Sequence, residues 1–183
     1  MISRFAKVLL RLCTTLSDWV LVGSLAFRFY GYDRVTVDID LFWIADDFQE
    51  AYRKLSNLGS VELFLEDGFA RVVVEGIAVE FIIVPAELLE KSILLKNTAV
   101  RAREFTLSSD IKVRVAAPEE LVALKILAGR HKDFADAAYF LENVEMDRSV
   151  LMQELKEVFE WNPERKALCE KFFPELVDRN PHP

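Results

Sequence analysis

The stretch Val35-Thr36-Val37-Asp38-Ile39-Asp40-Leu41-Phe42 decides the fold of this chain. Its odd positions hold Val, Val, Ile and Leu, while its even positions hold Thr, Asp, Asp and Phe. Because successive side chains of a β-strand point to opposite faces, this alternation predicts a strand with both aspartates on one face. Two carboxylates placed in this way, with Cα atoms roughly 6.6 Å apart, can reach one divalent cation or bridge two.

The chemistry of this aspartate pair favours a hard cation. Carboxylate oxygens suit Mg²⁺ or Mn²⁺, and Mg²⁺ commonly completes its coordination with water and substrate phosphate. The pair therefore predicts a phosphate-bearing substrate. An isolated Asp-x-Asp also fits the solvated face of a half-exposed strand, so the residues around it must decide between the two interpretations.

Two further features accompany Asp38 and Asp40. Gly23-Ser24 follows a strand expected at 19–22 and opens a short helix, a place where free backbone N–H groups can bind phosphate oxygens. Glu80 interrupts the apolar run 77–84, which predicts a buried strand. A carboxylate in such a strand needs either a metal ion or, in a purely structural role, a basic side chain as its partner.

The rest of the sequence predicts a mixed first part and a helical second part. In the first part we expect helices at 2–16, 25–30, 46–58 and 85–95, and strands at 19–22, 35–42, 61–65, 70–75, 77–84, 99–107 and 111–115. The last two strands flank a hairpin turn at Ser108-Ser109-Asp110, and four helices follow at about 118–129, 133–143, 147–160 and 164–178. This order predicts an α+β fold, in which a core at 1–116 is followed by a C-terminal helical region at 117–183 packed on that core.

Composition excludes several classes of protein. The chain has 183 residues, of which 52% are hydrophobic, so it is expected to fold rather than remain disordered. Its formal net charge of -7 argues against a nonspecific nucleic-acid coat. Cys13 and Cys169 lack the spacing of a zinc site or a disulfide framework and predict reduced thiols. No apolar run approaches about 20 residues, so we expect a cytoplasmic protein without a membrane span or signal peptide.

The combination of these features resembles the nucleotidyltransferase superfamily of the DNA polymerase beta type. Its elements are Val22-Gly23-Ser24, thirteen intervening residues, Asp38-Ile39-Asp40, and Glu80 in a later strand. The segment 34–41 is similar to the R-x-T-x-D-I-D segment of small prokaryotic proteins related to AbiEii toxins and to minimal nucleotidyltransferases. The stretch 117–136 is similar to the first C-terminal helices of the same proteins.

The resemblance implies an α/β nucleotidyltransferase core that uses Mg²⁺ or Mn²⁺ to transfer a nucleoside monophosphate from a nucleoside triphosphate (NTP) to a hydroxyl. The implied metal-binding and catalytic residues are Asp38, Asp40 and Glu80, with Glu80 also helping to deprotonate the hydroxyl. The implied substrate-binding residues are Gly23, Ser24, Arg34, Thr36 and Lys125. The implied acceptor is an RNA end such as that of tRNA, a partner protein or a small molecule, and the implied setting is a toxin–antitoxin pair. The alternative is a noncatalytic nucleotide- or partner-binding module of the same fold.

The first two predicted C-terminal helices carry charged residues close to their apolar faces. Lys125 lies on or beside such a face. It can neutralise triphosphate charge or simply extend along the edge of the core, and we expect the first role. Asp133 and Asp136 are expected to cap their helix and to pair with Arg130 or Lys132 rather than to bind metal.

Overall fold

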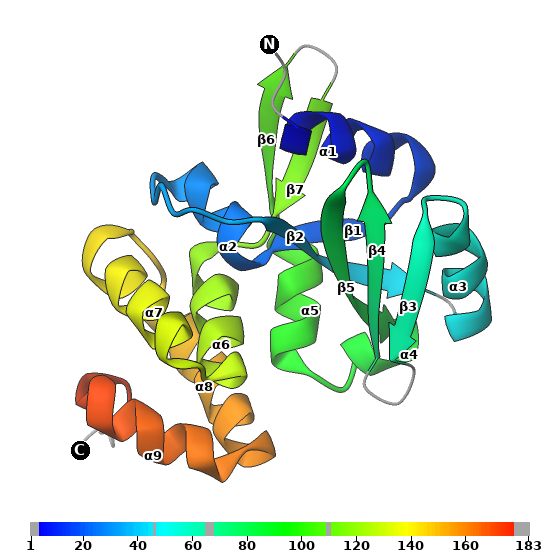
Figure 1. Cartoon of the computed structure of the whole chain (residues 1–183). Coiled ribbons are helices and arrows are strands. Elements are labelled where there is room, and N and C mark those ends of the chain that lie inside the picture. Colours follow the sequence, from blue (N-terminus) through cyan, green and yellow to red (C-terminus); the bar gives the residue numbers. More distant parts are fainter. Residues whose placement is uncertain (1–3, 46, 65–67, 109–110, 178–183) are drawn as a thin grey trace. The chain divides into compact units, whose positions relative to one another are not determined.

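The computed structural model describes residues 4–45, 47–64, 68–108 and 111–177 (Figure 1). The chain divides into two compact units, Met1–Ala117 and Pro118–Pro183. The first unit is a mixed sheet flanked by helices, and the second is helical. The chain therefore has the predicted α+β fold class.

The first unit contains a seven-stranded sheet, in the order β3-β4-β5-β2-β1-β7-β6, within the described residues. The strands are β1 (Trp19–Val22), β2 (Asp38–Ala45), β3 (Ser60–Phe64), β4 (Phe69–Val74), β5 (Ile77–Pro85), β6 (Arg103–Ser108) and β7 (Ile111–Val115). Strand β2 pairs in parallel with β5 and antiparallel with β1, so the sheet is mixed. The two strands that carry the predicted acidic residues therefore lie side by side in the middle of the sheet.

Helices of the first unit pack on this sheet. They are α1 (Arg4–Thr15), α2 (Gly23–Ala26), the 3₁₀ helix η1 (Phe27–Tyr30), α3 (Phe48–Ser56), α4 (Ala86–Leu89) and α5 (Ile93–Val100). Helix α1 contacts β5 and β7, α3 contacts β2 and β3, and α5 contacts β1. Ile39 and Leu41 of β2 and Val79 and Phe81 of β5 are completely buried, because they alternate with the acidic residues and point to the opposite face. This apolar face anchors the two central strands.

Strand β2 begins three residues later than the sequence predicts. It starts at Asp38, and its first pair with β5 joins Asp38 to Ala78. Val35 and Val37 precede the strand and are 85% and 78% exposed, although their alternation with polar residues predicted that the strand includes them. The prediction was wrong here because the backbone bends at Val37, so that the ladder with β5 begins only at Asp38.

Two further boundaries differ from the prediction. The helix expected at 85–95 is broken into α4 and α5, because the Ser92 side chain accepts a hydrogen bond from the Leu95 N–H and starts a new helix. The strand expected at 99–107 begins only at Arg103, since α5 continues to Val100. The parts of the predicted elements at 2–3, 46, 65, 109–110 and 178 lie outside the described residues.

A tight hairpin joins β4 to β5, as predicted from Gly76. Its turn residues Glu75 and Gly76 both have positive φ angles, 51° and 76°, which is typical of a type I′ turn. The turn fixes the register of the two strands and places Arg71 directly opposite Glu80. The hairpin therefore determines which side chain lies next to the predicted catalytic glutamate.

The second unit is helical, as predicted. Its elements are α6 (Pro118–Ala128), α7 (His131–Asn143), α8 (Arg148–Trp161), α9 (Pro163–Phe172) and the 3₁₀ helix η3 (Pro174–Leu176). Helix α6 contacts α7, α8 and α9. Throughout the described part of the chain, every helix is too short or too polar to span a membrane.

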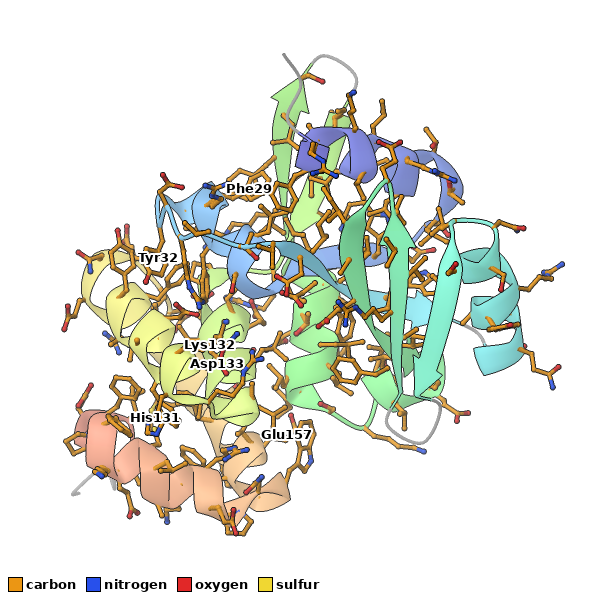
Figure 2. All side chains as sticks on the ribbon, in the orientation of Figure 1. Phe29, Tyr32, His131, Lys132, Asp133 and Glu157 are labelled. Atoms are coloured by element: carbon orange, nitrogen blue, oxygen red, sulfur yellow. The ribbon has the colours of Figure 1, made fainter. Side chains whose placement is uncertain are left out.

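A buried ion cluster joins α6 to α7. The Lys125 Nζ atom lies 2.9 Å from Asp133 Oδ1 and 2.9 Å from Asp136 Oδ2, and all three side chains are nearly inaccessible to solvent. Asp133, in the first turn of α7 (Figure 2), also accepts hydrogen bonds from the backbone N–H and guanidinium of Arg130. For Asp133 the predicted capping and pairing with Arg130 are confirmed. For Asp136 the prediction of the same roles was wrong in its partner, because this carboxylate pairs with Lys125.

Replacing Lys125 with Met is expected to destabilise the protein by about 3 kcal/mol or more, because two buried carboxylates lose the ammonium group that they share. The free energy of unfolding can be measured by urea titration. Lys132→Met is the matched control, since Lys132 is exposed, and it is expected to change stability by less than about 0.5 kcal/mol. Equal stabilities of the two variants would contradict the structural role of the cluster.

Asp133 predicts a specific dependence of stability on pH. Burial raises the pKa of its carboxyl, but the hydrogen bonds and charges of Arg130 and Lys125 outweigh burial and hold this pKa below its ordinary value of 3.8. A lowered pKa in the folded state contributes stability that is present above about pH 4 and is lost as the pH falls through the folded value. In Asp133→Asn, unfolding midpoints measured from about pH 7 to about pH 2.5 are expected to fall less steeply on the acidic side than in the wild type. An unchanged slope would contradict this expectation.

Both the backbone conformation and the lack of space favour glycine at position 23, so replacing Gly23 should reduce stability for both reasons. Its φ angle is 64°, and a β-carbon at this position would overlap the Asp40 side chain. Gly31 has a φ angle of 87° but open space around it, so Gly31→Ala is a control for backbone strain alone. We expect thermal melting to show a loss of about 1 kcal/mol in Gly31→Ala and a clearly larger loss in Gly23→Ala. Equal losses would mean that Asp40 moves away at no cost.

Candidate active site

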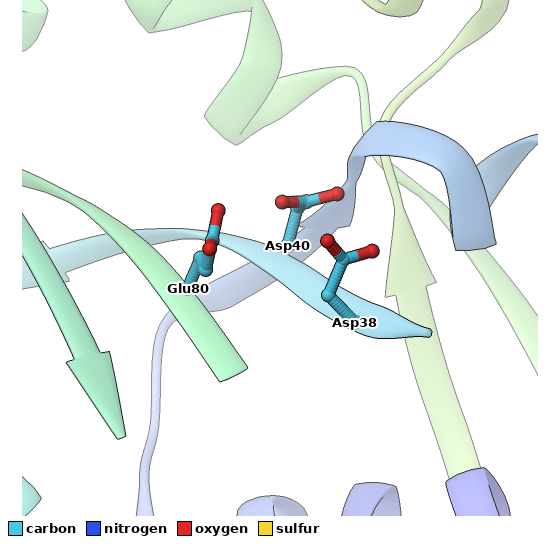
Figure 3. A group of neighbouring side chains, drawn as sticks. All are labelled: Asp38, Asp40 and Glu80. Atoms are coloured by element: carbon cyan, nitrogen blue, oxygen red, sulfur yellow. The ribbon is translucent and has the colours of Figure 1, made fainter. Parts of the chain in front are cut away.

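Three carboxylates meet on one face of the central sheet. Asp40 lies directly opposite Glu80 in the parallel ladder of β2 and β5, and Asp38 lies two residues before Asp40 on the same face. One oxygen of each carboxylate can be chosen so that all three atoms lie within 4.8 Å of one another. The three side chains are half-buried and project to the same side of the two strands (Figure 3). The structure thus brings together all three acidic residues that the sequence singled out.

The cluster has the composition of a site for a hard divalent cation. At 4.8 Å, two ionised carboxylates repel each other by roughly 3 kcal/mol at an effective dielectric constant of about 20. A divalent cation between them converts this repulsion into attraction. Because all the donors are carboxylate oxygens, the set fits Mg²⁺ or Mn²⁺ better than a metal that prefers nitrogen or sulfur.

The end of β1 lies beside this cluster. Val22 is the antiparallel partner of Asp40, so the chain passes the Asp40 carboxylate as it leaves the strand. The glycine that follows Val22 has no side chain, and the Asp40 side chain occupies the place that a β-carbon would take. The next residue, Ser24, accepts a hydrogen bond of 3.0 Å at its hydroxyl from the guanidinium of Arg34. Gly23, Ser24 and Arg34 are therefore neighbours of the acidic residues.

Thr36 lies at the same side of the sheet. Its hydroxyl donates a hydrogen bond of 2.6 Å to Asp38 Oδ1. The sequence predicted a substrate contact for Thr36, and the structure places its hydroxyl against a predicted metal ligand.

Lys125 belongs to the second unit, where its ammonium group is buried with Asp133 and Asp136. A lysine whose charge is already compensated by two carboxylates has a structural role in α6 and α7. Its contact with a triphosphate stays a prediction from the sequence resemblance.

Arg71 lies near the site and was not predicted from the sequence. It lies directly opposite Glu80 in the antiparallel ladder of β4 and β5, so the two side chains share a face of the sheet. Arg71 is exposed and can offer a positive charge to an anionic group bound next to Glu80. Counting outward from the two-residue turn Glu75-Gly76 pairs Val74 with Ile77 and, three residues further along each strand, Arg71 with Glu80.

Comparisons with known proteins locate similar structures but no similar sequences. No protein-family model matches the chain, and neither does any curated protein. The structure is similar to that of an antigenic nucleotidyltransferase-like protein from Paracoccidioides brasiliensis, with 16% identity, coverage of 92% of this chain and 94% of the other, and a TM-score of 0.49.

Two bacterial structures show a similar degree of likeness. One is a Thermotoga maritima protein to which nucleotidyltransferase activity is attributed, with 20% identity, coverage of 75% of this chain and 91% of the other, and a TM-score of 0.48. The other is JHP933 from Helicobacter pylori, with 15% identity, coverage of 96% and 82%, and a TM-score of 0.48. Because these TM-scores are below 0.5, the case for a function depends on the chain's own acidic cluster.

Proposed function

We propose that this protein is a nucleotidyltransferase that uses a divalent cation to transfer a nucleoside monophosphate from an NTP to a hydroxyl group. The observation that carries the proposal is the meeting of Asp38, Asp40 and Glu80 within 4.8 Å on two neighbouring strands. The adjacent Gly23-Ser24 turn supports it, because the order of these residues along the chain is the order of the superfamily's sequence motif.

In this proposal Asp38, Asp40 and Glu80 are the residues that hold Mg²⁺ or Mn²⁺. When bound, the cations stabilise the negative charge on the entering and leaving oxygens of an in-line displacement. Carboxylates on adjacent strands suit this role because the sheet fixes their spacing before the substrate arrives.

The chain's other residues act on the substrate and on the proton. The acceptor oxygen forms a bond to the α-phosphorus, the bond from that phosphorus to pyrophosphate breaks, and the hydroxyl proton passes to the Glu80 carboxylate. The hydroxyl of Ser24 and the backbone N–H of Gly23 bind the terminal phosphates. Arg34 donates a hydrogen bond to the Ser24 hydroxyl oxygen and so fixes this side chain beside the proposed phosphate site.

The proposal extends to the setting in which the protein acts. The similarity of segment 34–41 to AbiEii-related proteins supports a toxin–antitoxin context in the cytoplasm. An RNA end, a partner protein and a small molecule are the acceptor classes in this proposal. The formal net charge of -7 favours the last two over a long RNA, whose phosphates would be repelled.

Calorimetric titration of each NTP in the presence of Mg²⁺ tests the site without knowledge of the acceptor. We expect saturable binding that requires Mg²⁺. The double variant Asp38→Asn/Asp40→Asn should bind more than about 100-fold more weakly. Changing a residue that only hydrogen-bonds to a metal ligand already lowers metal affinity by about 10–100-fold, and this variant changes two of the ligands themselves.

Glu87→Gln/Glu164→Gln is the matched control for that titration, since it removes two carboxylates that are exposed elsewhere on the chain. Its affinity for the Mg²⁺-NTP complex should equal that of the wild type. Absence of saturable binding at about millimolar NTP would contradict the enzyme proposal and favour the noncatalytic partner-binding module.

The position of a radioactive label distinguishes the proposed transfer from transfer of the terminal phosphate. With cell extract as the source of acceptor, α-labelled NTP should label a macromolecule or small product, and γ-labelled NTP should release only labelled pyrophosphate. Asp38→Asn is expected to abolish the labelling. Label transferred from the γ-position by the wild-type protein, but neither by Asp38→Asn nor by the extract alone, would identify a kinase that uses the same cation site.

A further inference from the structure

We propose that Thr36 is a positioning residue that orients the cation ligand Asp38 and thereby raises the affinity of the site for its metal. This inference rests on the proposed function, because it assumes that Asp38 binds a divalent cation. It assigns to Thr36 a role exerted through Asp38 rather than a direct contact with the substrate.

The backbone before β2 presents alternate side chains to opposite sides. Arg34, Thr36 and Asp38 are half-buried, while Val35 and Val37 between them are exposed. Thr36 and Asp38 thus lie on the same, less exposed side, although the backbone bends at Val37 and the strand begins only at Asp38. Thr36 is therefore placed against Asp38 by the course of the backbone.

The hydrogen bond between these residues is short and has a fixed direction. Thr36 Oγ1 lies 2.6 Å from Asp38 Oδ1, within the range of a hydroxyl bound to an ionised carboxylate. An ionised carboxylate can only accept, so the threonine hydroxyl donates. A hydroxyl has one hydrogen, and the bond to Asp38 uses it. Thr36 is then left without a hydrogen to donate to a substrate phosphate.

This bond settles the orientation of the Asp38 carboxylate. Asp38 is repelled by Asp40 and Glu80, whose oxygens lie within 4.8 Å, and repulsion alone would turn its carboxylate away from the other two. A donor at Oδ1 opposes this rotation, and the carboxylate keeps further lone pairs with which to bind the cation. Hydrogen-bond partners of metal-binding carboxylates commonly change metal affinity by about 10–100-fold.

The same segment also supports the other side of the site. Arg34, two residues before Thr36, donates to the hydroxyl of Ser24, which follows β1. Side chains of this one short segment thus hold a residue after β1 and a residue of β2.

The test is the affinity of the protein for Mn²⁺, measured by the electron paramagnetic resonance signal of free Mn²⁺. Thr36→Val keeps the shape of the side chain and removes the hydroxyl, and we expect it to weaken Mn²⁺ binding by about 10-fold or more. Thr36→Ser keeps the hydroxyl and is expected to remain within about 3-fold of the wild type. Thr36→Ala also lacks the hydroxyl and replaces Thr36→Val in the comparison if the valine variant does not fold, as judged by thermal melting.

Val37→Thr is the matched control, because it adds a hydroxyl at the next position, which faces the other side of the segment. Its Mn²⁺ affinity should equal that of the wild type. Two results would overturn the positioning role and leave the proposed function standing. In the first, the wild type binds Mn²⁺ and the variants without the hydroxyl bind it equally tightly. In the second, Thr36→Ser loses as much Mn²⁺ affinity as those variants do. Absence of Mn²⁺ binding to the wild-type protein would overturn the proposed function together with this inference.

Discussion

The parallel pairing of β2 with β5 is the interaction on which the acidic site depends. It places Asp40 beside Glu80, and the two-residue period of β2 adds Asp38 to the same face. A shift of one residue in this pairing would move a buried side chain such as Ile39 or Val79 into the acidic row. The register of this pairing therefore decides both which side chains are buried and which form the acidic site.

A concentration of like charge is tolerated because the surrounding structure restrains it. The completely buried side chains of Leu41 and Phe81 secure the strands from the opposite face, so mutual repulsion of the carboxylates cannot separate them without exposing apolar surface. On the acidic face, the Thr36 hydroxyl stabilises one carboxylate and Gly23 leaves room for another. Packing thus holds three carboxylates close together on one face, which is the arrangement expected of a preorganised cation site.

Local pattern in the sequence was sufficient to predict most elements and the acidic residues. Asp38 and Asp40 were recognisable from alternation, and Glu80 from its place in an apolar run, because each departs from what a buried strand otherwise contains. The start of β2 could not be found in this way, since Val35 has strand propensity but finds no partner strand. Arg71 was missed for a related reason: its relation to Glu80 appears only when the register of the β4–β5 hairpin is counted.

The order of the strands has a consequence for how the site is acquired during folding. Asp40 and Glu80 are forty residues apart in the chain, and α3, β3 and β4 intervene between the two parallel strands. The entropy of closing this long connection must be overcome before the strands can pair, so their pairing belongs to the slow, nonlocal steps of folding. Helix α1 and the β4–β5 hairpin involve short-range contacts and can form earlier. A nascent or partly folded chain consequently lacks the assembled carboxylates, and any activity that requires them is withheld until the long-range topology is complete.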